Sequence, residues 1–192
     1  MSATAAAPSL PARPRRRRLG RGTLIALALL AVVALVLGLV VGTGGGNSSR
    51  AHARAGTYVA GDRSFSLSYP AGWHASALGA TAAVIQRSDN RGIVLVRERP
   101  ALHGKLSSIV KGLPRQLAKR FPDFRPVGAS VARLSTGPAV VYTFVRTKAD
   151  KVQTIVIAPM AGRSYTLEVV APTGAHDAAR QAGQIVRSLK SR

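Results

Sequence analysis

The 192-residue chain contains no cysteine, so it forms no disulfide, binds no metal through thiolates and carries no lipidated cysteine as an anchor. Acidic residues are scarce: 7 Asp and Glu are scattered among 28 Lys and Arg. Paired carboxylates, histidines at metal-ligand spacing, a nucleophile elbow and glycine-rich phosphate loops are all missing from the sequence. We therefore expect no metal, no cofactor and no enzymatic activity.

Aromatic residues are also few, at 5% of the chain, whereas the net charge is +21. Such a charge attracts polyanions, and the candidates are anionic lipid head groups, acidic wall polymers and nucleic acids. The sequence lacks a basic motif studded with aromatic residues that could stack on bases, which disfavours nucleic acid. Frequent Arg, Ala and Gly with little Lys is typical of a GC-rich bacterial genome.

Between Arg21 and Arg50 the chain carries no charged residue. Within this stretch, Thr23–Val41 consists almost entirely of Leu, Ala, Val and Ile, and as a helix it would be about 28 Å long, close to the hydrocarbon thickness of a bilayer. Because Arg-rich flanks stay in the cytoplasm, we predict a single-pass protein of the cell membrane with its N-terminus inside and its C-terminal domain outside. The six preceding arginines are Arg13, Arg15, Arg16, Arg17, Arg18 and Arg21.

A cleaved signal peptide is the alternative, since Ala53–Ala55 offers a small-x-small processing site. That site lies well beyond Val41, and the apolar core is longer than a signal core, so we favour an uncleaved anchor. The expected organisation is then a disordered basic cytoplasmic tail (1–22), a transmembrane helix (23–41), a flexible Gly/Ser linker (42–57) and an extracytoplasmic domain (58–192).

The first half of the domain shows two different periodicities. Alternating apolar residues predict a strand over Ser64–Tyr69. Ala82–Gln86 and Ile93–Arg97 are predicted as the next strands, separated by a polar loop that contains the turn residues Asn90 and Gly92. Apolar residues spaced by three and four then predict an amphipathic helix from Leu102 to Phe121. Gly112 and Pro114 weaken its middle, where we expect a kink or a break.

The second half returns to strands and ends in a helix. Short turns separate four predicted strands: Val127–Leu134, Ala139–Arg146, Val152–Ala158 and Ser164–Val170. These short connections indicate an antiparallel meander, with Thr154–Ile157 in a central strand. A final helix follows, with Thr173 as its N-cap. Two helices that interrupt a mostly antiparallel sheet, each with one apolar face to pack on it, define an α+β domain.

The segment Phe65–Trp73 resembles the F-x-x-x-Y-P-x-G-W opening of PsbP-like domains. The resemblance extends over about Tyr58 to Leu189 through the order of helix, meander and final helix. It implies a PsbP-like α+β fold of mostly antiparallel sheet with two packed helices, in a bacterial, membrane-anchored member of the family. It also implies a non-catalytic binding or accessory module.

Two sets of residues have both a structural and a functional interpretation. Either Tyr69 fills a sheet face and Trp73 covers the end of the core, which we favour, or the two form with His74 an aromatic ligand pocket. The basic residues of the first predicted helix either form a solvated face, which we also favour, or dock on an anionic lipid or wall polymer. These basic residues are Lys105, Lys111, Arg115, Lys119 and Arg120.

The sequence therefore predicts a membrane-anchored extracytoplasmic binding module of unknown ligand. Its expected partners are the membrane itself and another envelope protein or an anionic envelope component. The alternative is a secreted or anchored envelope hydrolase, whose site the sequence does not reveal. A third possibility is a structural or sensory subunit whose tail and membrane helix bind a partner.

Overall fold

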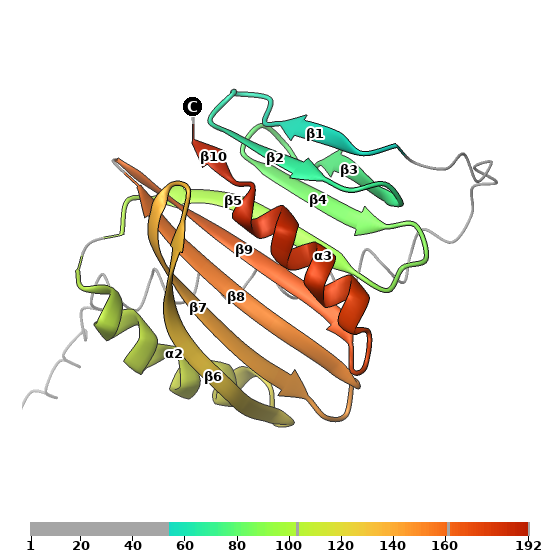
Figure 1. The fold of residues 1–192 in the computed structure, drawn as a ribbon. Coiled ribbons are helices and arrows are strands. Elements are labelled where there is room, and N and C mark those ends of the chain that lie inside the picture. The colour runs from blue at the N-terminus through green and yellow to red at the C-terminus, as the bar shows by residue number, and fades with distance from the viewer. Residues whose placement is uncertain (1–53, 103, 161, 192) are drawn as a thin grey trace, which may run out of the picture. The chain divides into compact units, whose positions relative to one another are not determined.

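A seven-stranded antiparallel sheet forms the centre of the domain (Figure 1). The computed structural model describes residues 54–102, 104–160 and 162–191, so the predictions for 1–22, 23–41 and most of 42–57 lie outside the described residues. Across the sheet the strands follow the order β3 (Trp73–Ala77), β4 (Ala82–Arg87), β5 (Ile93–Pro100), β9 (Arg163–Pro172), β8 (Lys151–Met160), β7 (Gly137–Arg146) and β6 (Phe124–Leu134).

The predicted meander is confirmed. Strands β6, β7, β8 and β9 are consecutive, and each pairs antiparallel with the next. On its other edge β9 pairs with β5, where Ile93 lies opposite Val170, so β9 occupies the middle of the sheet. The β-branched run Thr154–Ile157 lies in β8, an interior strand, as its composition predicts.

A second antiparallel sheet consists of three short strands, β1 (Gly56–Val59), β2 (Phe65–Tyr69) and β10 (Lys190–Ser191), with β2 in the middle. β2 corresponds to the strand predicted at Ser64–Tyr69, and its partner β1 was not indicated by the sequence. Gly56 and Thr57, expected at the end of the linker, belong to β1.

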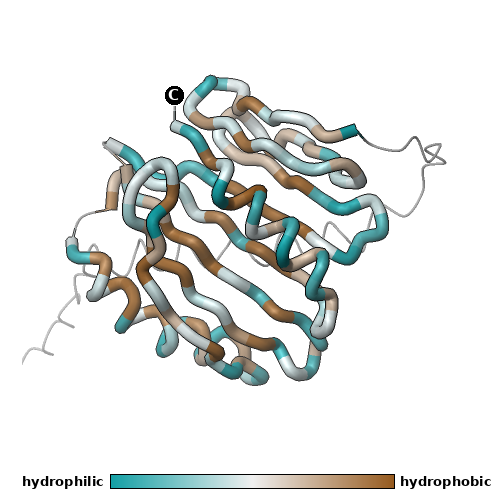
Figure 2. The backbone as a smooth tube through the Cα atoms, in the orientation of Figure 1, coloured by the Kyte–Doolittle hydropathy of each residue, from teal (hydrophilic) through white to brown (hydrophobic). Residues whose placement is uncertain are grey.

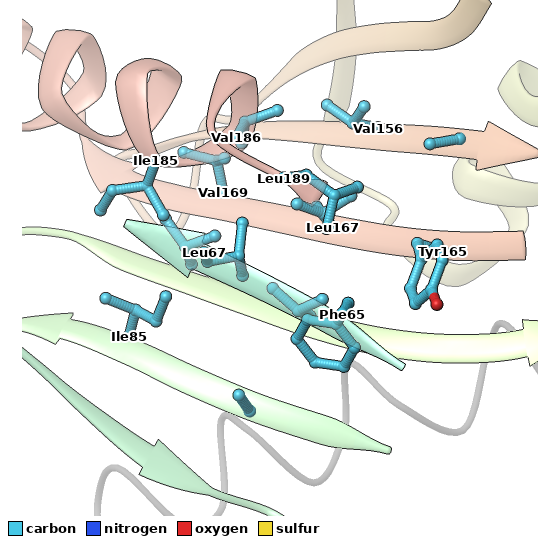
Figure 3. Packing of buried hydrophobic residues seen from close by; sticks show 14 of the residues in the cluster. Phe65, Leu67, Ile85, Val156, Tyr165, Leu167, Val169, Ile185, Val186 and Leu189 are labelled. Carbon is cyan, nitrogen blue, oxygen red and sulfur yellow. The ribbon is translucent and has the colours of Figure 1, made fainter. Parts of the chain in front are cut away.

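The main hydrophobic core lies between one face of the large sheet, α3 (His176–Arg187) and β2 (Figure 3). Phe65 and Leu67 of β2 and Ile185 of α3 are completely buried, which contributes roughly 2 kcal/mol for each side chain. The ring of Tyr165 meets Phe65 edge-on at a centroid distance of 5.4 Å. Figure 2 shows hydrophobic residues concentrated along the strands of the large sheet and hydrophilic residues at several turns.

The other helix, α2 (Leu106–Arg120), packs against β6 and β7 on the opposite face of the sheet (Figure 1). Val141 of β7 packs against the main core, so Phe144, three residues further along the strand, points to the other side. There Phe144 stacks on Phe121, just after α2, with the ring centroids 6.0 Å apart. Both predicted helices therefore pack on the sheet.

α2 differs from its prediction in two respects. It begins at Leu106 rather than Leu102, and it runs through Pro114 without a break. The proline removes one hydrogen bond of the helix, but Leu113 and Leu117 are buried on either side of it and hold both halves against the sheet. Within the described ranges, no helix is long and apolar enough to span a membrane.

The start of α3 also differs from its prediction. The helix begins at His176 after Ala175, without a side-chain cap, so Thr173 is not the N-cap. A tight turn intervenes, in which the amide of Ala175 donates to the carbonyl of Pro172 at 3.1 Å. Gly174 in this turn has a φ of 84°, which a residue with a side chain rarely adopts.

Candidate functional site

α3 covers only part of its face of the sheet. It contacts mainly β9, β5 and β2, and it leaves β8 and β7 open beside it (Figure 1). Between α3 and these strands lies a groove with a cavity volume of about 300 Å³, which we name the α3 groove. It is lined by Ser130, Ala132, Arg133, Leu134, Val141, Val152, Thr154, Val156, Val169, Ala171, Ala179, Gly183, Val186 and Arg187.

The floor of the α3 groove is apolar because strand geometry places every second residue on one face. Val152, Thr154 and Val156 alternate along β8 in this way, and Val169 of β9 lies beside them. The hydroxyl groups of Thr154 and Thr143 are hydrogen-bonded to each other at 3.0 Å. This pairing satisfies the polar atom in the floor, so the floor behaves as a largely apolar surface.

The helical wall of the α3 groove owes its space to small residues. Ala179, Gly183, Val186 and Arg187 follow the spacing of one helix face. A Cβ atom on Gly183 would meet Nη1 of Arg187 at 3.7 Å, so the guanidinium group lies beside the glycine rather than away from the helix. A larger residue at position 183 would occupy the groove next to this positive charge.

The β6–β7 hairpin forms the remaining wall. Ser130, Ala132 and Leu134 of β6 line the groove at alternating positions. Beyond them, the hydroxyl group of Ser135 donates to the carbonyl of Leu189 at 2.6 Å. This bond ties the hairpin to the segment that follows α3 and closes that end of the wall.

Only positive charge borders the α3 groove. Arg133 and Arg187 are both exposed, and no acidic residue belongs to the lining. The lining also lacks histidine and tyrosine, so it offers hydroxyl groups but no acid–base pair. Throughout the part of the chain that the structure describes, no group of three or more His, Asp or Glu side chains could hold a metal ion. The groove is thus suited to binding rather than to proton transfer.

The residues predicted to form an aromatic pocket lie elsewhere. Trp73 is completely buried, and its indole Nε1 donates to Oε1 of Gln181 in α3 at 2.8 Å. Tyr69 is half-buried at the end of β2, and His74 is exposed on β3. None of the three lines the α3 groove, and the burial of Trp73 agrees with the structural interpretation. A pocket formed by Tyr69, Trp73 and His74 stays a prediction.

The predicted basic surface divides into two parts. Lys105, Lys111, Arg115 and Lys119 are exposed on or next to α2, as either interpretation of this surface requires. Arg120 is half-buried and lies near the ring of Phe121, with the guanidinium carbon 5.2 Å from the ring centroid. Burial lowers the pKa of Arg120, although Glu168 partly opposes this effect. Docking of the exposed residues on an anionic surface stays a prediction.

Sequence reasoning missed a buried carboxyl group on β9, Glu168, which is 8% exposed. Its neighbours in the strand belong to the main core, so Glu168 points to the face that carries α2. Burial raises the pKa of Glu168 to about 7, even though Arg120, Arg97 and Arg99 favour its charged form. The sequence signal that could have identified this buried carboxyl group is its position as the one acidic residue within the apolar run of residues 167–170.

A second buried carboxyl group stabilises the turn after α2. Asp123 accepts a hydrogen bond from Nε of Arg146 at 2.6 Å and another from the amide of Lys148 at 3.0 Å. Burial works to raise the pKa of Asp123, but these two bonds together with the positive charge of Arg146 and a further backbone hydrogen bond outweigh it and hold the pKa below its usual value. Since the guanidinium carbon of Arg146 also lies 4.0 Å from the centroid of Phe121, this ion pair is part of the packing under α2.

Comparison with solved structures identifies the architecture. The chain matches the solution structure of cyanobacterial PsbP (CyanoP) from Synechocystis sp. PCC 6803 with a TM-score of 0.56 and 11% identity, over 79% of this chain and 100% of that one. The fold is PsbP-like. The Saccharomyces cerevisiae Ran-binding protein Mog1p also matches, with a TM-score of 0.51 and 10% identity, over 72% of this chain and 96% of that one.

A protein of Bacteroides thetaiotaomicron VPI-5482 matches over 71% of this chain, with a TM-score of 0.46 and 16% identity. This chain spans about half of that protein, 48% of its length. No protein-family model matches the sequence, and no curated protein matches it either. The matches to CyanoP and Mog1p confirm the PsbP-like resemblance of Phe65–Trp73 for the fold. At these identities the likeness carries the fold and not an activity.

Proposed function

We propose that this chain is a single-pass membrane protein that displays a non-catalytic, PsbP-like binding module outside the cell membrane. The observation that carries the proposal is the α3 groove, an apolar depression between α3 and the sheet with a volume of about 300 Å³. Ligand sites are typically concave, mostly apolar and provided with a few polar groups, as this groove is. The Ran-binding description of Mog1p is a precedent for binding by this fold.

The anchor and the orientation rest on the sequence. Thr23–Val41 has the length and composition of a membrane span, and the arginines before it favour a cytoplasmic N-terminus. The partner is then a component of the envelope, either another protein or an anionic lipid or wall polymer, in keeping with the net charge of +21.

A hydrolase is not favoured by the geometry of the described residues. Glu168, the carboxyl group with a strongly raised pKa, faces the side of the sheet that carries α2. The α3 groove lies on the other side and contains neither an acid nor a histidine. The perturbed carboxyl group and the cavity therefore do not form one site.

Topology can be tested with full-length chains that carry a reporter after Arg192. We expect an alkaline phosphatase fusion to be active, because that enzyme folds only outside the cytoplasm, and a fusion that removes residues 23–41 to be inactive. A phosphatase fusion that is inactive with the span present, in cells that accumulate the protein, would contradict the proposed orientation.

Binding can be tested by native mass spectrometry of the full-length protein purified from its own membranes. We expect a retained mass in the wild type and its loss in Gly183→Leu, which places a side chain in the α3 groove. Gln184→Leu is the matched control, since position 184 is exposed on the same helix and does not line the groove. Retention of the same mass by Gly183→Leu would show that the groove is not the binding site.

A further inference from the structure

The lining of the α3 groove spans four neighbouring strands, β9, β8, β7 and β6, a width of about 14 Å at the spacing of paired strands. Along β8 it extends from Val152 to Val156, which at the rise of a strand is about 13 Å. Along α3 it extends from Ala179 to Arg187, which at the rise of a helix is about 12 Å. With a volume of about 300 Å³, the groove lies at the lower end of the range of ligand sites, which is about 300–1,000 Å³. A site of this size suits one alkyl chain rather than several.

The floor of the α3 groove excludes a bound peptide strand. β8 is paired on both sides, with β7 and with β9, so its backbone N–H and C=O groups are already engaged. A peptide lying on this floor would leave its own amide groups without partners in an apolar site, which is costly. Sugars are disfavoured for the same reason, because Ser130 and Thr154 are the lining hydroxyl groups and Thr154 is already bonded to Thr143.

Charge then selects the head group of the ligand. Arg187 and Arg133 are the charged residues of the lining, and the guanidinium group of Arg187 lies over Gly183 at the side of the groove. A cationic head group would be repelled and a neutral one would gain no ion pair. A carboxylate or a phosphate accepts charge-assisted hydrogen bonds from either guanidinium group.

We propose that the α3 groove binds a single-chain anionic amphiphile, with its alkyl chain on Val152, Val156 and Val169 and its anionic head group at Arg187 and Arg133. This inference rests on the proposed function and names its ligand class. The open stretch of β8 and β7 beside α3 is the expected path of the chain (Figure 1). Because both arginines are exposed, the head group stays at the solvent-facing rim while the chain is buried.

The test uses the full-length protein in lipid nanodiscs with diazirine-bearing dodecanoate, and maps the labelled peptides by mass spectrometry. We expect labelling on the β8 peptide around Val156 and the α3 peptide around Gly183. Matched dodecanol and dodecylamine probes should label these peptides less. A dodecyl phosphate probe distinguishes a phosphate from a carboxylate head group, and preferential labelling by either anion supports the proposal.

Charge and shape are then tested separately. Arg187→Gln should lower dodecanoate labelling of the groove peptides about fivefold at a subsaturating probe concentration, the ratio expected for one ion pair at a protein surface. Arg180→Gln is the matched control, because Arg180 is exposed on α3 and does not line the groove. Gly183→Leu should abolish labelling by all four probes.

The outcomes separate this inference from the proposed function. Equal labelling by dodecanol and dodecanoate, or no effect of Arg187→Gln, would overturn the anionic head group. The groove peptides could stay unlabelled while the mass that Gly183→Leu loses proves to be a peptide or a sugar. This result would overturn the proposal of an amphiphilic ligand but would leave the proposal of a binding module in place. If Gly183→Leu changes neither the retained mass nor the labelling, both proposals fail.

Discussion

The close approach of Trp73 to Gly92 makes a strong prediction about stability. A Cβ atom at position 92 would lie 2.6 Å from Cη2 of Trp73 and 3.1 Å from its Cζ2. Carbon atoms pack at about 3.5–4.0 Å, so the indole ring would have to move by roughly 1 Å. The ring is completely buried and bonded to Gln181, which resists that movement. We expect Gly92→Ala to destabilise the domain by about 2 kcal/mol, as overpacked cores do.

The control is the same substitution where space is free. A Cβ atom on Gly112, inside α2, would have Nε2 of Gln116 at 3.8 Å as its nearest neighbour outside the helix backbone. Alanine is favoured over glycine in helices, so Gly112→Ala should stabilise the domain by about 0.5–1 kcal/mol. Circular dichroism during thermal unfolding should therefore give a melting temperature about 8 °C below that of the wild type for Gly92→Ala and a few degrees above it for Gly112→Ala.

A second substitution tests the cause. Phenylalanine lacks the atoms that meet position 92, so Trp73→Phe should remove most of the added cost of Gly92→Ala, although it is itself destabilising. The double-mutant cycle should show a coupling of about 1–2 kcal/mol. If Gly92→Ala unfolds at the temperature of the wild type, or costs as much in the Trp73→Phe background as in the wild-type background, the steric explanation is wrong.

Three further predictions concern polar groups. The raised pKa of Glu168 means that the native state resists ionisation of this carboxyl group, so the stability of the domain should fall as the pH rises from 4.5 through about 7. Urea unfolding should therefore show that Glu168→Gln raises the free energy of unfolding by up to about 3 kcal/mol at pH 8 and leaves it unchanged at pH 4. The lowered pKa of Asp123 has the opposite sign, so Asp123→Asn should destabilise the domain at pH 7 and lose this effect when acid protonates the wild-type carboxyl group. Ser135→Ala removes the bond to Leu189 and should cost about 1 kcal/mol, with faster amide exchange at Leu189 and a smaller change at Val141.

The local sequence pattern predicted most of the large sheet. The pattern of short apolar or β-branched segments between turn residues identified β4, β5 and the four strands of the meander, of which β5, β8 and β9 are buried on both sides over part of their length. It missed β3, where Trp73 is buried but the residues after it are mostly exposed, and it missed β10, which has only two residues. Such strands are defined by the partners that they meet, and those partners are distant in sequence.

The α3 groove could not be predicted for a related reason. Ala179 and Gly183 resemble any small residues of an amphipathic helix, and the valines of β8 resemble core residues. They line a cavity because α3 lies over β9 and β5 rather than over β8, and this placement follows from the packing of Ile185 with β2 and β9. By contrast, burial of Trp73 was the favoured interpretation of the Phe65–Trp73 motif, and the structure agrees with it.

The pairing of β10 with β2 affects how the protein is made. Lys190 lies opposite Ser66, so residues near the end of the chain complete the sheet that begins the domain, and α3 supplies the cover for Phe65 and Leu67. The N-terminal strands thus lack part of the cover of their core until α3 has been synthesised. If the proposed membrane anchor directs export during synthesis, we expect the domain to cross the membrane as an unfolded chain and to fold on the far side. A stop codon just before α3 would leave Phe65 and Leu67 without this cover, and the truncated chain should be open to proteolysis.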